Sequence, residues 1–460
     1  MTTPPPAPTA HTAALAPAGC PAHAQATRGL RPLYGPEAEA QPYALYERLR
    51  AEHGAVAPVL LYGDVPAWLV LGHRENLEVM RSSRFSSDSR HWRAIREGTV
   101  AADSPLLPIT AWQPLVALTD GAEHARLRTA VTESLGRVNR HRLRRYITRY
   151  TTRLIGEFAM SGRADLVADF ARKLPALVVC QQLGIPENDA LTVGAAVTDM
   201  ISGGETALAS NQLVVKLLHD LVERKKTHPG DDLVSHLLEH PAGLTDEEVR
   251  EHLRLVLVAA LEPTANLMAS ALRMVLTDGR FRGHLSGGQM TLPDALEQVL
   301  WDHPPLAVVP TRWATGDTQL GGTRIMAGDM VMLGLAAGNV DPSIRPDLTV
   351  PMQGNRSHLA FGAGVHECPG QDLGRAIAEA GVDLLLERIP DLHLAVDDDQ
   401  VQVVGTWMAR RITSLPVAFA PQREERPAAV QQRPEPPVRH DVAPAPGERA
   451  GSRWFRRRRP

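Results

Sequence analysis

The sequence contains little cysteine and no excess of charge of either sign. Only three of its 460 residues are cysteine, at positions 20, 180 and 368. Because these cysteines are far apart and form no CxxC pair, a disulfide framework and a zinc site are both disfavoured. A reducing, cytoplasmic compartment is therefore expected. The formal net charge of −3 provides no global field that would attract nucleic acid, so no nucleic-acid partner is expected.

Long apolar runs are also absent. A membrane-spanning helix needs about eighteen or more consecutive apolar residues. The closest candidate, residues 253–276, is interrupted by Arg254, Glu262 and Arg273, so it predicts a buried helix and no membrane span. The first thirty residues show no basic segment followed by an apolar one, and no signal peptide is expected. The sequence therefore predicts a soluble protein.

The two ends of the chain differ in composition from the middle. Residues 1–28 are rich in Ala, Pro and Thr, and residues 421–460 are rich in Pro, Arg and Glu, so both ends are predicted to be disordered. The basic stretch 454–459 suits an anionic surface or a protein partner, although a solvated tail without a role is the more ordinary interpretation. No turn-rich linker or internal repeat divides residues 29–420, which predicts one large domain.

Hydrophobic periodicity predicts a mainly α fold. Apolar residues recur at helical spacing in several segments, namely 143–158, 213–221, 249–276 and 374–389. Short strand-like pieces occur at 67–71, 325–332 and 415–419. Many helices with little sheet favour a large helical domain carrying small β-sheets over a doubly wound α/β fold.

The segment 358–375 has the most specific pattern in the chain. Gly362 and Gly364 permit left-handed backbone conformations and close approach to a flat ligand. Pro369 suits a first helical turn, and a helical pattern follows it. Cys368 therefore lies at a junction between loop and helix, where the helix dipole and free amide groups favour a thiolate. A thiolate can ligate haem iron and donate electron density to it.

The motif Phe361-Gly362-x-Gly364-x-His366-x-Cys368-x-Gly370 resembles the haem-binding loop of cytochromes P450 at every defining position. The resemblance implies the cytochrome P450 fold, haem b (iron protoporphyrin IX) as cofactor, Phe361 among the cofactor-binding residues and Cys368 as the metal ligand. From the residues alone, two alternatives stay open. One is a buried structural cysteine in a glycine-rich turn, and the other is a zinc site, for which two further nearby ligands are missing.

Four cationic or hydrogen-bonding residues match the positions that bind the haem propionates in that family. His124 and Arg128 are four residues apart, on one face of a predicted helix, in a segment that resembles the family's C-helix. Arg312 matches the propionate arginine in the strand after the K-helix, and His366 is similar to the fourth such group. Each residue alone would usually be solvated, but all four occur in the order that the resemblance requires.

The resemblance covers residues 29–420 and is of the actinobacterial type. Further segments resemble the end of the B-helix, the end of the E-helix, the segment before the meander and the final sheet, namely 84–87, 180–186, 336–342 and 413–416. The second of these segments implies that Cys180 is structural.

The sequence departs from the family pattern on the oxygen-binding face. Within residues 259–266, Glu262 occupies the acidic position, but Pro263 replaces the threonine whose hydroxyl the family uses there. A proline inside a helix removes an amide hydrogen bond and kinks the helix. Thr264 points about 100° further around the helix, so it serves only if the kink turns it inward. Otherwise water or a substrate hydroxyl must relay protons. Glu262 and Thr264 are the predicted catalytic residues.

A second departure affects the family's Glu-x-x-Arg pair, which would occupy positions 298 and 301. Gln298 and Trp301 stand there and cannot form the buried ion pair. An amide and an aromatic ring can fill the site without burying charge, which need not destabilise a fold. The pattern Glu-Gln-x-Leu-Trp resembles an unusual actinobacterial subgroup, and we interpret it as a mark of lineage.

The resemblance also implies partners. The equivalents of the substrate pocket are largely apolar, which favours a lipophilic small molecule such as a terpenoid, polyketide or fatty acid, although each residue is equally compatible with ordinary core. The candidate lining residues are Trp92, Trp112, Leu257, Leu261, Val308, Val309, Trp407 and Met408.

No fused flavin or iron–sulfur motif is present, so electrons are expected from a separate ferredoxin and ferredoxin reductase. A basic cluster resembles the face on which acidic ferredoxins dock, although a solvated helix face is equally compatible with it. Its members are Arg126, Arg137, Arg140, Arg142, Arg144 and Arg145.

Three functions are consistent with these observations. The leading one is a haem-thiolate monooxygenase that inserts one oxygen atom from O2 into an apolar small molecule. The second is a haem enzyme that uses peroxide, and the third is a non-catalytic haem protein that senses a ligand or acts as a regulatory subunit. Similar actinobacterial proteins occur in operons with regulatory GTPase-like partners, which supports the third. Pro263 is the feature that keeps the second and third open.

Overall fold

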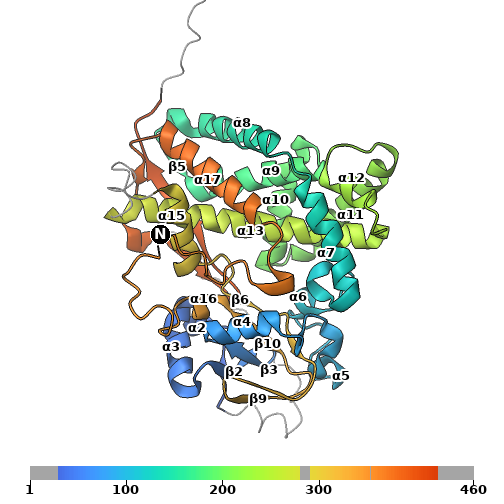
Figure 1. Ribbon diagram of the computed structural model, residues 1–460. Coiled ribbons are helices and arrows are strands. Elements are labelled where there is room, and N and C mark those ends of the chain that lie inside the picture. The colour runs from blue at the N-terminus through green and yellow to red at the C-terminus, as the bar shows by residue number, and fades with distance from the viewer. Residues whose placement is uncertain (1–28, 280–290, 353, 423–460) are drawn as a thin grey trace, which may run out of the picture. The chain divides into compact units, whose positions relative to one another are not determined.

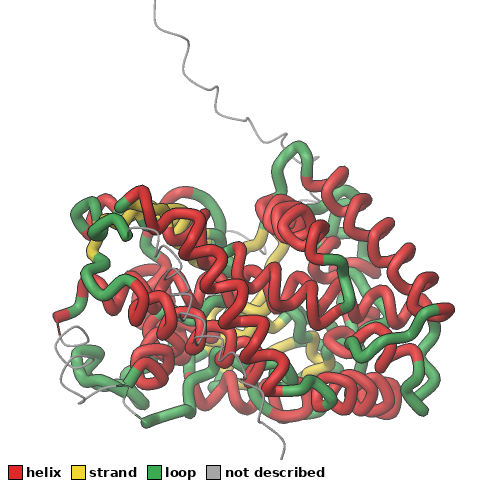
Figure 2. The backbone as a smooth tube through the Cα atoms, turned by 90° about the horizontal axis from the view of Figure 1, so that it is seen from above, coloured by secondary structure: helices red, strands yellow, loops and turns green. Residues whose placement is uncertain are grey.

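The computed structural model describes residues 29–279, 291–352 and 354–422. The segments 1–28 and 423–460, which the sequence predicts to be disordered, lie outside the described residues, so that prediction stays untested. Figure 2 shows that helices dominate the described part and that strands occupy limited areas. The prediction of a mainly α fold with small sheets is confirmed.

Four of the described α-helices begin at a side chain that caps a backbone amide, namely Asn139, Asp232, Thr245 and Thr291. The bounds of the described α-helices are α2 (Pro36–Ala40), α3 (Pro42–His53), α4 (His73–Arg81), α5 (Arg93–Arg96), α6 (Leu107–Thr110), α7 (Gly121–Gly136), α8 (Arg140–Phe158), α9 (Lys173–Leu183), α10 (Glu187–Ser202), α11 (Ala207–Thr227), α12 (Leu233–Leu238), α13 (Asp246–Thr277), α15 (Leu292–Asp302), α16 (Leu335–Asn339) and α17 (Gln371–Arg388). Short 3-10 turns are η1 (Ser89–His91), η2 (Val116–Leu118), η3 (Ala159–Ser161), η5 (Gly364–His366) and η6 (Asp398–Gln400), and η4 (Val167–Ala171) is a π-helical turn.

Helix α13 is the central element of the helical part, as Figure 1 shows. It begins at a capping box in which Thr245 and Glu248 each bond the other's backbone amide. It packs against α9, α11, α15 and α17. Among the described residues it alone is long and apolar enough to cross a membrane, but 61% of its most apolar stretch is buried inside the fold. Helix α13 is therefore a core helix, as the sequence predicts from the charged residues that interrupt its apolar run.

The largest sheet has the strand order β1-β2-β3-β10-β6. Strands β2 and β3 are antiparallel and are joined at Gly63 and Asp64, both of which have positive φ, at 78° and 55°. Because Leu61 pairs with Val65, the turn comprises the three residues 62–64, and a left-handed residue is common in three-residue hairpin turns. Strand β10 lies parallel to β3 and antiparallel to β6.

The remaining strands form smaller sheets, β11-β14-β5, β12-β13, β4-β7 and β8-β9. The strand bounds are β1 (Arg31–Pro32), β2 (Val56–Leu61), β3 (Val65–Val70), β4 (Phe85–Ser86), β5 (Arg163–Asp165), β6 (Val308–Val309), β7 (Trp313–Ala314), β8 (Thr318–Leu320), β9 (Thr323–Ile325), β10 (Val331–Gly334), β11 (His393–Leu394), β12 (Gln402–Gly405), β13 (Arg410–Ser414) and β14 (Pro416–Ala418).

The predicted strand 325–332 is wrong as a single element. The chain turns at Gly328, whose φ is 80°, and thereby separates β9 from β10. The apolar residues on both sides of this turn continue the pattern, so alternation alone does not reveal the break. The feature of the sequence that indicates this break is Gly328, a glycine inside an apolar run.

Candidate functional site

The loop before α17 depends on its glycines. Gly362 and Gly364 have φ values of 69° and 74°, which favour glycine over other residues. A Cβ atom on Gly364 would lie 2.7 Å from the carbonyl oxygen of Met80, so a side chain there requires α4 or the loop to move. The amide of Cys368 donates a hydrogen bond to the carbonyl oxygen of Phe361 over 2.9 Å. These contacts fix Cys368 ahead of the first turn of α17.

The environment of Cys368 acts on its thiol in two opposing ways. Burial raises the pKa of the Cys368 thiol, whereas the amides of Gly370 and Gln371 at the start of α17 and the charge of Arg128 lower it by less. The helix start therefore favours the thiolate, as the sequence predicts, but does not offset burial. A bound metal ion provides the additional positive charge that deprotonates such a thiol.

His124 and His366 lie in contact at the centre of a cluster of basic side chains. His124 is buried on α7, and its ring centroid lies 4.1 Å from that of His366. Burial, followed by His366, Arg128 and Arg312, lowers the pKa of His124 to about 4. The Nε2 atom of His124 is buried and has no hydrogen-bond partner in the part of the chain that the structure describes. The four predicted propionate-binding residues therefore share one site.

Arg312 is the most deeply buried cation of this cluster. Only 5% of the residue is exposed, and burial lowers its pKa to about 10. Its Nη1 atom donates to the carbonyl oxygen of Thr311 over 2.6 Å. Within residues 29–279, 291–352 and 354–422, Arg312 forms no ion pair with a carboxylate. The charge of Asp120 acts on Arg312 without a direct ion pair. A buried guanidinium without a directly paired anion is costly, so this site fits a further anionic group.

The exposed side of the cluster is connected to the Cys368 loop. Arg128 Nη1 donates to the carbonyl oxygen of Glu367 over 2.6 Å, and His366 Nε2 lies 3.1 Å from Ser87 Oγ. Together with Arg312 and the unpartnered nitrogen of His124, these groups fit two carboxylates placed beside the thiol of Cys368. Haem has that combination of a metal and two propionates.

Asp120 is a member of this site that sequence reasoning missed as a functional residue. Although burial raises the pKa of Asp120, hydrogen bonds with His366 and Ser86 lower it to about 2 overall. The amide of Ser87 also donates to Asp120 over 2.9 Å. Asp120 thus supplies one negative charge among the cations. The sequence could have indicated this role, because Asp120 begins the motif that contains His124.

Helix α13 places Glu262 and Thr264 in different surroundings. Glu262 is 8% exposed, and its Oε1 lies 3.3 Å from Nη1 of Arg411 on β13. Thr264 is buried, and its Oγ1 lies 3.5 Å from the position a Cβ would take on Gly374 of α17. The helix stays continuous through Pro263. The hydroxyl of Thr264 therefore faces Gly374 of α17.

The opposite side of α13 is open near the proline. Ala259 is exposed, although it lies in the middle of the core helix. Because Pro263 has no N–H group, the carbonyl of Ala259 lacks its usual helical donor. A small side chain and a free carbonyl at this point suit close approach of a flat ligand.

Helix α15 carries Gln298 and Trp301 in a buried site, but the expectation that this site buries no charge is wrong, because the buried guanidinium of Arg345 lies 5.7 Å from the Trp301 ring centroid. Gln298 Oε1 accepts from the amide of Met352 over 2.8 Å, and its Nε2 donates to Asp302 over 2.7 Å. Trp301 Nε1 donates to the carbonyl oxygen of Asn355 over 2.8 Å. An amide and an aromatic ring therefore occupy these positions. The helix also buries a charge one residue earlier, at Glu297, which sequence reasoning missed.

Most candidate substrate-lining residues are buried in the described chain. Trp92, Leu257 and Val308 are at most 1% exposed, as ordinary core residues are. Trp112 is 36% exposed, and the guanidinium of Arg90 lies 4.6 Å from its ring centroid.

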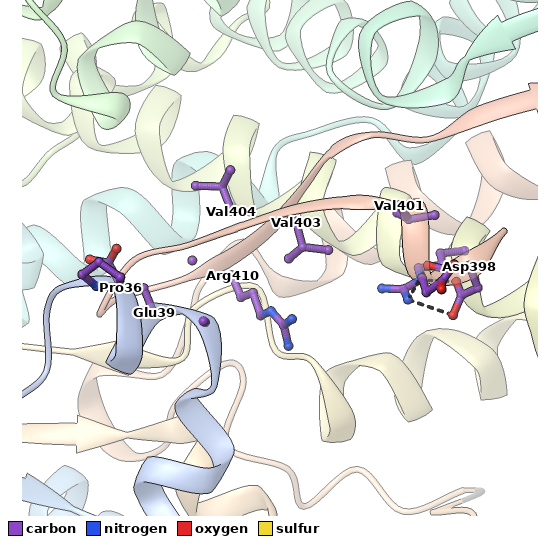
Figure 3. A pocket seen from close by; sticks show the side chains of 11 residues that line it. Pro36, Glu39, Asp398, Val401, Val403, Val404 and Arg410 are labelled. Atoms are coloured by element: carbon purple, nitrogen blue, oxygen red, sulfur yellow. Dashed lines mark hydrogen bonds and ion pairs between the residues drawn. The ribbon is translucent and has the colours of Figure 1, made fainter. Parts of the chain in front are cut away.

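A polar pocket of about 540 Å³ lies elsewhere, between α2, the β12–β13 pair and the end of α13 (Figure 3). None of the predicted site residues lines this pocket. The pocket is therefore separate from the Cys368 site.

Comparison with known proteins gives a consistent result, although no protein-family model matches the chain. It is 32% identical over 383 residues to 2-hydroxy-5-methyl-1-naphthoate 7-hydroxylase of Streptomyces carzinostaticus, covering 80% of this chain and 93% of that protein. It is 31% identical over 395 residues to vitamin D(3) 25-hydroxylase of Pseudonocardia autotrophica, covering 83% and 94%.

A solved structure of testosterone-bound CYP154C4 from Streptomyces sp. ATCC 11861 superimposes with a TM-score of 0.76 at 28% identity, covering 82% of this chain and 95% of that one. The relatives are bacterial haem oxidoreductases, many of them from Streptomyces. The predicted fold, the haem cofactor and the monooxygenase class are thereby confirmed. The chain belongs to the cytochrome P450 family.

Proposed function

We propose that this protein is a haem-thiolate monooxygenase in which Cys368 is the axial ligand and one oxygen atom from O2 is inserted into an apolar small molecule. The family and the monooxygenase class follow from the relatives, whereas the ligand and the substrate class are proposals. One observation carries them. Cys368 follows a glycine loop in which a side chain at Gly364 would meet the Met80 carbonyl, and this loop adjoins two buried basic residues, Arg312 and His124.

The residues around this loop are suited to hold the cofactor. Cys368 would ligate the iron, while His124, Arg128, Arg312 and His366 would bind the propionates. Arg312 would contribute most, because it is buried and has no carboxylate partner among the described residues. When bound, the haem supplies the oxygen-activating chemistry, which a thiolate ligand promotes.

Glu262 and Thr264 are proposed to control protons at this site. Glu262 is buried within α13 but is connected through Arg411 to the hydroxyl of Ser202 at the end of α10, over 3.0 Å. The contact with Arg411 holds the Glu262 carboxylate next to the altered position 263. Thr264 assists only if its side chain turns away from Gly374, and otherwise water relays the proton.

The substrate is proposed to be lipophilic. Relatives are named for vitamin D(3) and for 6-deoxyerythronolide B, and solved relatives contain testosterone or myristic acid. The residues near the centre of α13 are apolar as well: Leu255 and Val256 are partly buried and Ala259 is exposed. An apolar surface of this kind binds carbon skeletons by excluding water.

Electrons are proposed to come from a separate ferredoxin and its reductase in the cytoplasm. Arg137, Arg144 and Arg145 are exposed, whereas Arg126 pairs with Glu248 and Arg142 with Asp231. The first three therefore suit an acidic partner better than the last two. A regulatory GTPase-like partner, and the lineage assigned to Gln298 and Trp301, rest on the resemblance alone.

A peroxide-using enzyme is the second candidate, and a specific observation favours it. The threonine position holds Pro263, and the next hydroxyl, on Thr264, faces Gly374 of α17. Peroxide already contains the protons that the relay, and the electrons that the ferredoxin, would otherwise deliver.

The deciding experiment compares three conditions on the haem-loaded protein with a lipophilic ligand found by its shift of the Soret band. Turnover with ferredoxin, reductase and NAD(P)H supports the monooxygenase. Turnover with hydrogen peroxide alone supports the second candidate. Ligand binding without turnover in either condition contradicts both and leaves a ligand-sensing or regulatory role.

A further inference from the structure

Glu297 lies next to the position where the family's buried acid is missing. It is 3% exposed, and its carboxylate pairs with Arg375 of α17. His358 Nε2 lies 3.0 Å from its second oxygen. A buried carboxylate is tolerated only when it is paired and hydrogen-bonded, and this one has both kinds of partner.

Arg375 connects Glu297 to the Cys368 loop. The carbon atom of its guanidinium lies 4.7 Å from the ring centroid of Phe361, a distance at which a cation is attracted by an aromatic face. The carbonyl oxygen of Phe361 in turn accepts the amide of Cys368 over 2.9 Å. Three contacts therefore lead from Glu297 to the proposed axial ligand.

His358 provides a second connection from the same carboxylate. Its Nδ1 accepts from the amide of Ala360 over 3.3 Å, so in the neutral ring Nε2 carries the proton and donates to Glu297. The ring of His358 lies 5.8 Å from that of Phe361 between centroids. Arg375 and His358, both held by Glu297, thus contact the same aromatic ring.

We propose that Glu297 is a positioning residue for Cys368, and that it replaces the ion pair lost at positions 298 and 301. It holds Arg375 and His358 against Phe361, whose backbone carbonyl orients the amide of Cys368. The inference rests on the proposed ligation by Cys368. A purely structural role, in which Glu297 only joins α15 to α17, would leave the iron–sulfur bond unaffected.

Gln298 provides a matched control. It is the next residue of α15 and is also buried, at 4% exposure. Its hydrogen bonds go to Met352 and Asp302, and neither of these two partners belongs to the Cys368 loop. Loss of its side chain should therefore lower stability without changing the cysteine's ligation.

The experiment uses the haem-loaded protein and compares wild type with Glu297→Gln, Arg375→Lys and Gln298→Ala. The ferrous carbon monoxide complex shows separate Soret bands for thiolate and thiol ligation, and thermal unfolding is followed in parallel. Glu297→Gln should raise the ratio of thiol to thiolate form about tenfold, equivalent to about 1.4 kcal/mol. Arg375→Lys should do the same because lysine lacks the planar surface that contacts Phe361.

The double variant Glu297→Gln with Arg375→Lys should exceed the larger single effect only slightly, since both changes interrupt one path. Gln298→Ala should lower the unfolding temperature while keeping the wild-type ratio. Should Glu297→Gln fail to retain haem, Arg375→Lys becomes the deciding variant.

The inference is overturned if Glu297→Gln and Arg375→Lys both keep the wild-type ratio of thiol to thiolate form while losing stability as Gln298→Ala does. That result leaves the proposed function unaffected. A wild-type protein that binds haem but shows no thiolate band overturns the proposed function and this inference with it.

Discussion

Arg411 on β13 lies 3.3 Å from the carboxylate of Glu262 on α13, measured from Nη1 to Oε1. The same guanidinium donates to Ser202 at the end of α10. One cation thus connects the β12–β13 pair, the central helix and a peripheral helix. Because Glu262 precedes Pro263, this contact restrains the part of α13 in which the family pattern is altered.

Pro263 provides a test of the altered oxygen-binding face. Pro263→Thr restores both a hydroxyl and the N–H that bonds the carbonyl of Ala259, whereas Pro263→Ala restores only the N–H. We expect Pro263→Thr to raise the product formed per NAD(P)H severalfold, because the added hydroxyl can take part in proton transfer. Product and released peroxide are measured together. If Pro263→Ala and Pro263→Thr form equal amounts of product per NAD(P)H, the missing hydroxyl does not limit product formation.

Gly364 tests the backbone of the Cys368 loop. Gly364→Ala combines a positive φ of 74° with a Cβ only 2.7 Å from the carbonyl oxygen of Met80. We expect it to lower stability by about 1–3 kcal/mol and to reduce haem retention. Gly362→Ala has a similar φ but no atom within 4 Å of the added Cβ, so it is the matched control with the smaller loss. Thermal unfolding and the haem content of the purified proteins measure both effects. Equal losses in the two variants would contradict the role of the Met80 contact.

Arg312 tests the assignment of the propionate site. Arg312→Gln removes a charge-assisted contact worth about 1.5–3 kcal/mol, so haem should dissociate about tenfold faster or more. Transfer of haem to an excess of an apo-globin measures the rate. Arg324→Gln is the control, because Arg324 is exposed and pairs with Asp317 over 3.0 Å. A rate unchanged from wild type in Arg312→Gln would remove Arg312 from the site.

His358 predicts a specific dependence of stability on pH. Burial lowers its pKa from 6.5 to about 4, so between these values the unfolded chain binds a proton that the folded protein does not. The contribution is present above pH 6.5 and is lost as the pH falls to about 4, by at most about 3 kcal/mol. Urea unfolding of wild type and His358→Gln between these pH values measures it. Parallel pH profiles of the two proteins would contradict the assignment.

The sequence predicts the local features of this site well. The glycine and cysteine spacing of the 361–370 loop depends on residues close together in the chain, and His124 with Arg128 depends on one helical turn. The long helical segments also coincide with α8, α11, α13 and α17, because amphipathic periodicity extends over many residues.

Non-local contacts could not be predicted in the same way. The pair of Glu297 with Arg375 joins α15 to α17, and nothing in either helix indicates which residue faces the other. Asp120 was likewise overlooked because its importance comes from Ser86 and His366, which are distant in sequence. The direction of the Thr264 hydroxyl depends on how α13 packs against Gly374.

The most direct test of the central claim is the carbon monoxide spectrum of the reduced, haem-loaded protein, recorded for wild type and for Cys368→Ala. The account predicts a thiolate-type Soret band in wild type and its complete loss in Cys368→Ala. Cys180→Ala serves as the control and should keep the band, because Cys180 is buried in the helical core. A thiolate-type band that persists in Cys368→Ala would contradict the account.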